Sequence, residues 1–344
     1  MYFVLYDRNL RSIGETYILE SWSRTQRAVD FDDMKIAGEQ IPYYANPFFV
    51  VVNDRQGKMM FSGLASTPSI DEKTKKTTLS LKDYLTLTNT EIVVDWSKFT
   101  GETVAEYLEF IFSLWLEQTE TGFSGIQIDT SDLVDIPLDS EIQFGESKEN
   151  VSLYPLVSDA LNYYNLYCDY DLNIPEKTLT YIFKRASINP VSIRLSDFGV
   201  DFIEKSFGEY NRASVYNHLY EKKQEWALTE SNTVVKLPSD ESLVYPAKNK
   251  NFVAEEEGDE SLYEAVYDAV MGLAGNRYQE NIDLNAQQYK SILDLSSTDF
   301  SYRASVYTKE GYYRDLPVGE IETDSKGKHV IRLGHRIQEL TQEL

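Results

Sequence analysis

The side chains most often used for acid–base or metal chemistry are few in this sequence. The histidines are His218, His329 and His335, and the single cysteine is Cys168. No histidine belongs to an HExxH pattern or to another metal-ligand spacing, and Cys168 has no histidine near it in the sequence. We therefore expect surface or interface roles for the histidines and an inert, buried thiol. We assign no catalytic, cofactor-binding or metal-ligating residue.

Loops that bind calcium or phosphate are not recognisable either. Asp169 opens the stretch DYDLN, which resembles the start of a calcium loop. Ile174 stands where that loop needs glycine, and Thr180 stands where it needs a bidentate glutamate. Neither GxGxxG nor GxxxxGK[ST] occurs. The absence of nucleophile, base and cofactor patterns points towards a structural or binding role.

The charge of the chain is strongly negative, with 56 acidic and 33 basic residues and a net charge of −23. Phosphate binding depends on lysine and arginine, so this charge argues against general affinity for nucleic acid or anionic membranes. It would instead repel a polyanion that passes close by. Residues 119–159 hold nine acidic residues and one base, Lys148. Two interpretations remain open for this segment: a solvated loop face, or a surface that repels an anionic molecule.

Composition also bears on compartment and on surface character. One cysteine permits no internal disulfide, the N-terminus has no basic segment before its short apolar run, and no stretch has the length of a membrane span. We expect a soluble protein synthesised in the cytoplasm. The 25 tyrosines suit either extensive interfaces or simply a strand-rich fold, and the two interpretations have equal weight.

Residues 47–89 carry the clearest β pattern. Extended runs at 48–52, 58–67 and 77–81 alternate with turns at 53–57 and 71–76, which predicts a three-stranded antiparallel meander followed by an amphipathic segment at 83–88. Earlier extended runs at 2–6 and 12–19 suggest a small barrel or sandwich. Residues 21–29 are ambiguous, and we close this first domain near Val94.

The middle of the chain reads as α+β. Thr103 and Glu106 form a capping box at the start of a helix with one apolar stripe, which Gly122 is expected to end. A second helix is predicted over residues 152–166, with Pro155 in its first turn. A hairpin between residues 166–170 and 179–183 follows, and the region ends near Pro190.

From Val191 onward the pattern returns to strands. Residues 211–226 fit strand or helix, whereas 233–237 and 242–245 read as strands. A third helix at 262–273, capped by Ser261 or Asp259, is predicted as an insertion. The runs at 304–307, 312–322 and 329–333 then repeat the order of residues 47–89, and the segment 336–341 repeats its amphipathic end. Chance similarity between β-hairpins is the alternative to a true repeat.

The order of these segments resembles the tail-hub family of bacteriophages, which includes the N-terminal hub part of siphophage tail-associated lysins, often grouped as prophage tail endopeptidase proteins. Together the matching segments span nearly the whole chain. They are FFVVVNDRQGKMMFSG with TTLSLKDYL, TVAEYLEFIF, YPLVSDALNYYNLYCDYDLN with KTLTYIF, and YRDLPVGEIETDSKGKHVIRLGHR.

This resemblance implies a mainly β, α+β fold with two related tube-like β-barrel domains. The expected domains are 1–94 for the first barrel, 95–190 for an α+β domain, and 191–344 for the second barrel with a helical insertion around 255–290. Two barrels in each of three subunits give six similar positions, so a threefold object could meet a sixfold one.

The function implied is that of a structural tail hub in the virion baseplate of a phage or prophage. Such a homotrimer closes the tail tube below a hexameric distal tail protein, contacts a tape-measure protein or tail fibre, and lets DNA pass during ejection. Family members often continue into a hydrolase, whereas this sequence stops at Leu344, so we expect no lytic activity and no cofactor. The alternative is a hydrolase or carbohydrate-binding module acting on the cell envelope, which the tyrosine and tryptophan content supports weakly.

Overall fold

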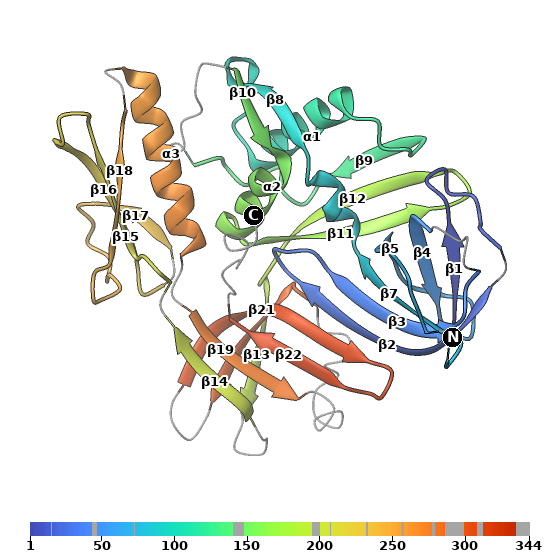
Figure 1. The fold of residues 1–344 in the computed structure, drawn as a ribbon. Helices are drawn as coiled ribbons and strands as arrows, with labels where there is room; N and C mark the ends of the chain where they lie inside the picture. The colour runs from blue at the N-terminus through green and yellow to red at the C-terminus, as the bar shows by residue number, and fades with distance from the viewer. Residues whose placement is uncertain are drawn as a thin grey trace.

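In the residues that the structure describes, the chain is mainly β with three α-helices, in agreement with the expected α+β class (Figure 1). The computed structural model describes residues 1–14, 16–42, 47–71, 73–139, 148–194, 200–206, 208–231, 233–255, 258–276, 279–285, 299–307 and 312–334. Among these residues, no helix has both the length and the apolar character needed to cross a membrane.

The N-terminal end is a circuit of six antiparallel strands. Their pairings run β1–β4–β5–β7–β3–β2 and return from β2 to β1. Alternate residues of these strands are buried, for example Phe3 and Leu5 in β1. They form an apolar cluster that includes Ile36, Val50 and Leu79. The strands are β1 Tyr2–Tyr6, β2 Tyr17–Arg27, β3 Asp33–Glu39, β4 Phe49–Asn53, β5 Met59–Ala65 and β7 Lys76–Lys82.

The predicted meander is confirmed, and two details are added to it. A short strand, β6 Ser69–Asp71, follows β5 and continues alongside β7, and the segment at 83–88 is a 3₁₀ helix, η1 Tyr84–Thr88.

Before the meander, the structure differs from the sequence prediction in β2, where the prediction had a return arm at 12–19 and an ambiguous stretch at 21–29. It is one strand of 11 residues.

The central region packs two helices against two small sheets. Strand β8 Glu91–Asp95 pairs with β10 Lys148–Ser152, and the predicted hairpin of β11 Leu166–Asn173 and β12 Thr178–Arg185 is confirmed. Strand β9 Gly125–Asp129 joins β12 in parallel, and a 3₁₀ turn, η2 Trp96–Lys98, follows β8.

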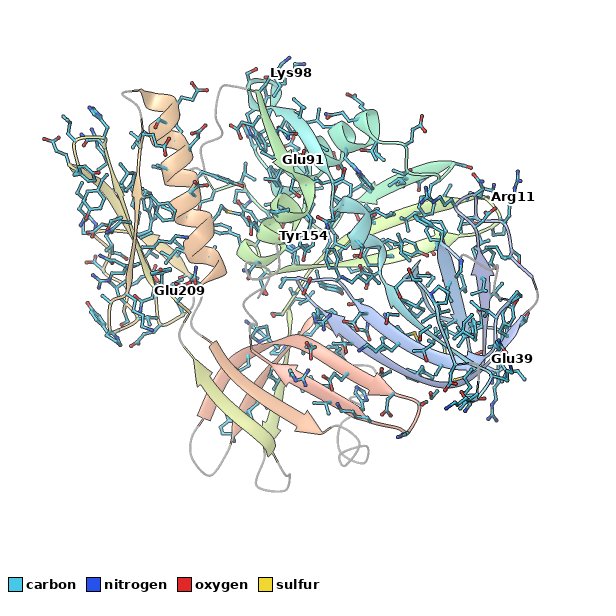
Figure 2. The ribbon with its side chains drawn as sticks, in the orientation of Figure 1. Arg11, Glu39, Glu91, Lys98, Tyr154 and Glu209 are labelled. Carbon is cyan, nitrogen blue, oxygen red and sulfur yellow. The ribbon has the colours of Figure 1, made fainter. Side chains whose placement is uncertain are left out.

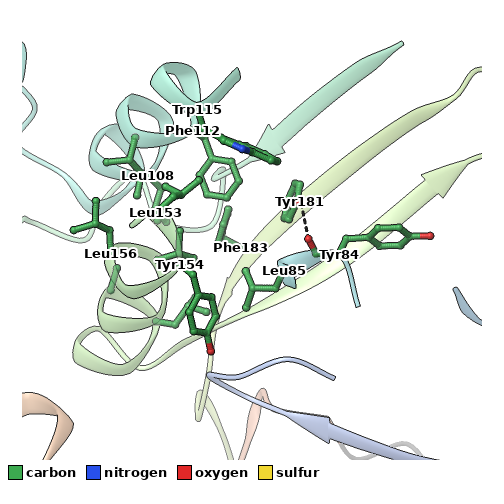
Figure 3. Packing of buried hydrophobic residues seen from close by; sticks show 14 of the residues in the cluster. Tyr84, Leu85, Leu108, Phe112, Trp115, Leu153, Tyr154, Leu156, Tyr181 and Phe183 are labelled. Carbon is green, nitrogen blue, oxygen red and sulfur yellow. Dashed lines mark hydrogen bonds between the residues drawn. The ribbon is translucent and has the colours of Figure 1, made fainter. Parts of the chain in front are cut away.

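Aromatic side chains fill the space between these central elements (Figure 3). Phe112 and Trp115 of helix α1 Val104–Gln118 contact Tyr181 of β12, and all three are fully buried. The Tyr181 hydroxyl donates a 2.8 Å hydrogen bond to the carbonyl of Tyr84, which lies at the end of the N-terminal circuit. The central core and the circuit are therefore packed as one body.

The helix ends follow local sequence in part. Thr103 and Glu106 form the predicted capping box, and Pro155 lies in the first turn of α2 Leu153–Tyr163. The predicted end of α1 at Gly122 was wrong: the helix ends at Gln118, and Gly122 adopts a left-handed φ of 80° in the loop that follows. The stretch Glu117–Gln118–Thr119–Glu120 has no apolar residue to hold another turn against the core.

Six strands are present in the described part of the C-terminal end, paired in the order β13–β20–β21–β22–β19–β14. The extended runs predicted at 304–307, 312–322 and 329–333 are confirmed as β20, β21 and β22. The segment 336–341 and His335 lie outside the described residues. The strands are β13 Asn189–Arg194, β14 Val200–Ser206, β19 Gln279–Asn285, β20 Tyr302–Tyr307, β21 Tyr312–Asp324 and β22 His329–Leu333.

The two ends pair their strands in the same order. Strands one to six along the chain are β1, β2, β3, β4, β5 and β7 at the N-terminal end, and β13, β14, β19, β20, β21 and β22 at the C-terminal end. In both ends the first strand pairs with the fourth, the fourth with the fifth, the fifth with the sixth, the sixth with the third, and the third with the second. One direction differs, because β1 and β4 are antiparallel whereas β13 and β20 are parallel. The first and second strands also pair at the N-terminal end, and no such pair is present among the described residues of the C-terminal end.

The chain between β14 and β19 forms an additional unit, in which helix α3 Asp259–Gly275 covers one face of a four-stranded sheet (Figure 1). Residues 211–226, ambiguous in sequence, form two of its strands. The strand predicted at 242–245 was wrong, because this segment makes only an isolated bridge at Leu243. The strands are β15 Arg212–Tyr216, β16 Lys222–Leu228, β17 Val234–Lys236 and β18 Asn249–Val253.

Helix α3 is confirmed, but its predicted cap was wrong. Gly258 is the N-cap, in place of Asp259 or Ser261, and a glycine has no side chain with which to cap the helix. A helix that is held by burial of its apolar stripe against a sheet does not depend on such a cap.

A glycine in the fifth strand of each end leaves no room for a side chain. A Cβ atom at Gly63 would lie 2.3 Å from the Lys82 carbonyl oxygen, and one at Gly319 would lie 2.3 Å from the Gly334 carbonyl oxygen. We predict that Gly319→Ala lowers the free energy of unfolding by about 1–3 kcal/mol, because the strands must move apart. Urea unfolding measures the loss.

Gly125→Ala is the matched control, since its Cβ would make only an ordinary 3.7 Å contact with Thr178. Stability equal to the wild type or slightly higher is expected there. Equal stability of Gly319→Ala and the wild type would contradict the close packing of β21 against β22.

Candidate assembly site: the joint between the two ends

A strand from the N-terminal end and a strand from the C-terminal end meet in one β ladder. Strand β2 pairs antiparallel with the second half of β21, from Ser23 opposite Asp324 to Arg27 opposite Glu320. The ladder continues past both ends of this register. The Ser325 amide donates to the Trp22 carbonyl at 2.9 Å, and the Ala28 amide donates to the Gly319 carbonyl at 3.1 Å. Backbone hydrogen bonds thus join the two ends edge to edge. We call this ladder the joint.

Glu320 is the charged centre of the joint and is almost completely buried. The register places it opposite Arg27 on β2 and, on its other side, opposite Arg332 on β22. Its carboxylate forms ion pairs with both, at 3.4 Å to the Arg27 Nε atom and in close contact with the Arg332 guanidinium. Arg332 also reaches Glu322 at 2.6 Å. Each guanidinium is thus paired with the buried carboxylate, and loss of that carboxylate would leave charge at the joint without its shared partner.

Arg27 extends this network into the N-terminal end. Its guanidinium lies 2.7 Å from the Asp33 carboxylate and donates to the Phe31 carbonyl at 2.8 Å. Neighbouring Arg24 lies over the Phe61 ring at 5.0 Å and pairs with Asp32 at 3.2 Å. The local sequence explains this grouping, because the turn between β2 and β3 brings acids at 32 and 33 back beside arginines at 24 and 27.

Buried carboxylates connect the joint to the central region. The Asp83 carboxylate caps η1 by accepting from the Leu85 amide at 3.0 Å, and it accepts from the Asp32 amide at 2.7 Å. Burial raises the pKa of Asp83 well above its ordinary value, and the nearby Asp32 charge raises it further. Burial also raises the pKa of Asp32, against the lowering effect of Arg24.

Tyr154 of α2 directly links the central region to the N-terminal end. Its hydroxyl donates a 2.8 Å hydrogen bond to Asp30, in the turn after β2, and its ring stacks on Phe31. In Figure 2 Tyr154 lies near the centre of the molecule, between the helices and the N-terminal strands, and in Figure 3 its hydroxyl points away from the helices. The central region thereby fixes the turn that directly follows the segment of β2 paired with β21.

The residues singled out in the sequence are not brought together. His218 lies in the turn after β15, His329 begins β22 and pairs with Thr323, and Cys168 lies in β11. Cys168 is half-buried and not fully buried as expected, and desolvation raises the pKa of its thiol well above its ordinary value. The stretch that resembled a calcium loop is part of β11. No group of metal-ligating side chains gathers in the part of the chain that the structure describes.

Sequence reasoning missed Arg27, Glu320 and Arg332. Two local features could have drawn attention to them: charged residues at alternate positions in a strand, Glu320 and Glu322, and a close group of arginines and aspartates at the end of β2. The pairing itself leaves no local pattern, because its partners are almost 300 positions apart in the 344-residue chain. What the arrangement does chemically is to hold the N-terminal and C-terminal strands of one continuous sheet in a fixed register.

Solved structures of tail proteins share this fold. No family model matches the chain, and no curated protein sequence matches it. The 43 kDa tail protein of prophage MuSo2 from Shewanella oneidensis is 14% identical, with a TM-score of 0.52 over 97% of both chains. A tail protein from Neisseria meningitidis is 12% identical, with a TM-score of 0.51 over 97% of this chain and 96% of that one.

Prophage tail protein gp18 from Listeria monocytogenes is also 12% identical, with a TM-score of 0.50 over 99% of this chain and 96% of that one. At such identities the likeness establishes the fold, and it does so along nearly the full length of each chain. The resemblance to phage tail proteins expected from the sequence is therefore confirmed at the level of the fold.

Removal of the charge on Glu320 tests the joint. We predict that Glu320→Gln lowers the free energy of unfolding by about 2–4 kcal/mol, because Arg27 and Arg332 keep their charges and lose their shared partner. Chemical denaturation at neutral pH measures this loss.

Glu20→Gln is the control, since Glu20 pairs with Lys76 at an exposed site where both side chains are more than 40% accessible. A change within about 0.5 kcal/mol is expected for it. A Glu320→Gln protein as stable as Glu20→Gln would show that the buried network does not stabilise the joint.

Proposed function

We propose that the chain is a structural hub protein of a phage or prophage tail, and that it assembles as a homotrimer. In this assembly the two ends of each subunit act as related tube-like β-barrel domains, so that three subunits present six similar positions. The hub would then close the tail tube below a hexameric distal tail protein and surround the path of the DNA. The observation that carries the proposal is the shared strand order of the two ends together with their joint.

A ring of this kind needs two kinds of contact. One connects the N-terminal end to the C-terminal end within a subunit, and the β2–β21 ladder supplies it. The other must connect the C-terminal end of one subunit to the N-terminal end of the next. If the two contacts are equivalent, three copies form a closed ring with six similar positions. Head-to-tail contacts of this type form rings whenever the rotation closes.

The strands that would form the second contact can be identified by correspondence. In the C-terminal end β21 runs beside β22 and offers its other edge to β2. In the N-terminal end β5 and β6 together run beside β7 in the same way. The outer edge of β6 therefore corresponds to the outer edge of β21, the edge that pairs with β2.

The counterpart of β2, the second strand, is β14. Within the described residues β6 pairs only with β7, and β14 pairs only with β19. Unpaired strand edges are a template for pairing with another chain. The second contact would thus join β14 of one subunit to β6 of the next.

The charge of the chain suits a DNA path that does not retain DNA. A net charge of −23 provides repulsion from phosphate rather than binding to it. The expected location is the tail tip of a virion, with the tape-measure protein or a tail fibre as further partners. The expected domains at 1–94, 95–190 and 191–344 are retained as part of this proposal.

The oligomer is the first prediction from this proposal. Light scattering on the purified chain should give three times the 39.6 kDa mass of one chain, or, after mixing with its distal tail protein, a complex that contains three copies of this chain. A monomer under both conditions that cleaves or binds peptidoglycan would instead support the alternative, an envelope-acting hydrolase or carbohydrate-binding module.

A disulfide between subunits tests the strands involved. In a Cys168→Ser background, Ile70→Cys in β6 and Ile203→Cys in β14 should form an intersubunit disulfide under mild oxidation, because paired strands lie about 5 Å apart. The control combines Ile70→Cys with Val134→Cys, an exposed position of the central region, and should give none. A trimer in which both cysteine pairs cross-link equally would support the trimeric state and contradict the pairing of β6 with β14.

A further inference from the structure

The outer edge of β8 is occupied by a side chain where a sheet would have its next strand. Within the described residues β8 pairs only with β10. On its other edge, the side chain of Gln118 at the end of α1 accepts a 2.8 Å hydrogen bond from the Val93 amide and donates a 2.9 Å hydrogen bond to the Val93 carbonyl. Two residues that exchange both bonds in this way form the hydrogen-bonded pair of an antiparallel ladder. The Gln118 amide group therefore takes the place of one residue of an antiparallel strand.

This edge lies at the surface of the molecule. Val93 is 48% exposed, and both Glu91 and Gln118 are exposed. In Figure 1 β8 and β10 lie beside α1 at the top of the view, and in Figure 2 Lys98, just after β8, reaches the upper boundary of the molecule. An exposed glutamine can leave such an edge at small cost, because water replaces the hydrogen bonds that it gives up.

The strand offers more backbone groups than the two that Gln118 binds. Alternate residues of a strand direct their N–H and C=O groups to the same edge, so Glu91 and Asp95 face the same side as Val93. Their side chains also share one face with Val93, whereas Ile92 and Val94 are buried in the central core. A strand added here would displace Gln118 and run along all five residues of β8.

The charges beside the edge differ at its two ends. Asp95 has the Lys98 ammonium at 3.7 Å, and the register places Lys148 of β10 opposite it. Glu91 instead accepts a 3.0 Å hydrogen bond from the neutral side chain of Asn150. The attraction for a basic side chain is therefore strongest at the Glu91 end.

This pattern sets the sequence that fits the edge. In an antiparallel strand centred on Val93, the residue opposite Glu91 comes two positions after the residue opposite Val93. Apolar side chains and opposite charges stabilise directly opposed positions of a sheet. The edge thus favours an apolar residue followed, two positions later, by lysine or arginine.

A second copy of the chain is a poorer occupant. If β8 paired with itself about Val93, Glu91 would lie opposite Asp95 at both ends of the ladder, and like charges that oppose each other destabilise a sheet. Two chains with a net charge of −23 each would also repel one another. The charges therefore favour an extended segment of a different, basic protein.

We propose that the outer edge of β8 is a strand-addition site, which binds an extended segment of a partner protein antiparallel to β8, with an apolar residue opposite Val93 and a basic residue opposite Glu91. Main-chain hydrogen bonds would provide the affinity, and the two side-chain positions the selectivity. Gln118 covers the edge until the segment displaces it, and this protects the edge from pairing with other chains.

A labelled peptide tests the site in the full chain. The probe is Thr-Thr-Thr-Val-Thr-Lys-Thr with an N-terminal fluorophore, and fluorescence anisotropy measures its affinity. We expect Gln118→Ala to bind it about tenfold more tightly than the wild type, because the peptide no longer has to displace two hydrogen bonds. Hydrogen–deuterium exchange gives the location: the Val93 amide should exchange faster in Gln118→Ala, and the peptide should slow it again.

Two controls keep the result specific. Glu117→Ala changes the neighbouring exposed residue of α1 and should leave the affinity within about twofold of the wild type. A peptide with glutamate in place of lysine should bind about fivefold more weakly, and Glu91→Gln should reduce this difference.

Three results would overturn the proposal. The first is an affinity that Gln118→Ala leaves unchanged, and the second is equal binding of the lysine and glutamate peptides. The third is dimerisation of Gln118→Ala without peptide, which would assign the edge to a second copy of the chain.

Discussion

The antiparallel ladder between β2 and β21 is the constraint on which the rest of the structure depends. It joins segments near opposite ends of the chain, so everything between them must fold into a shape that returns β21 to the edge of β2. Closing so long a loop has an entropic cost that grows only slowly with its length, and a ladder with a buried ion network can offset it. Glu320 supplies the charge that both Arg27 and Arg332 need, and the register of three strands brings the three side chains together.

The two ends use one strand order for two purposes. The N-terminal end closes its circuit and stays compact, with its fifth strand divided into β5 and β6 around Pro68. The C-terminal end keeps its fifth strand continuous as the 13-residue β21, which is long enough to pair with β20 in its first half and with β2 in its second. It also carries the unit of β15 to β18 and α3 between its second and third strands, where the N-terminal end has a short turn. In the proposed ring, two ends that differ in this way would present similar inner surfaces and different outer surfaces.

Sequence was informative where structure is local. The capping box at Thr103 and Glu106, the proline in the first turn of α2 and the meander at 47–89 each depend on residues a few positions apart, and each was predicted correctly. It was less informative where packing decides. The segment Ser21–Arg27 has no apolar alternation to mark it as a strand, and becomes one because β3 and β21 pair with its two edges.

The central claim is that one joint inside each subunit is repeated, in related form, between subunits. Electron microscopy of the purified chain, or of its complex with the distal tail protein, tests this most directly through the rotational symmetry of end-on views. The account predicts closed rings with threefold symmetry whose inner wall shows six similar densities, two from each chain. Particles of one chain, open filaments, or rings in which the two ends of a subunit occupy unrelated positions would contradict it.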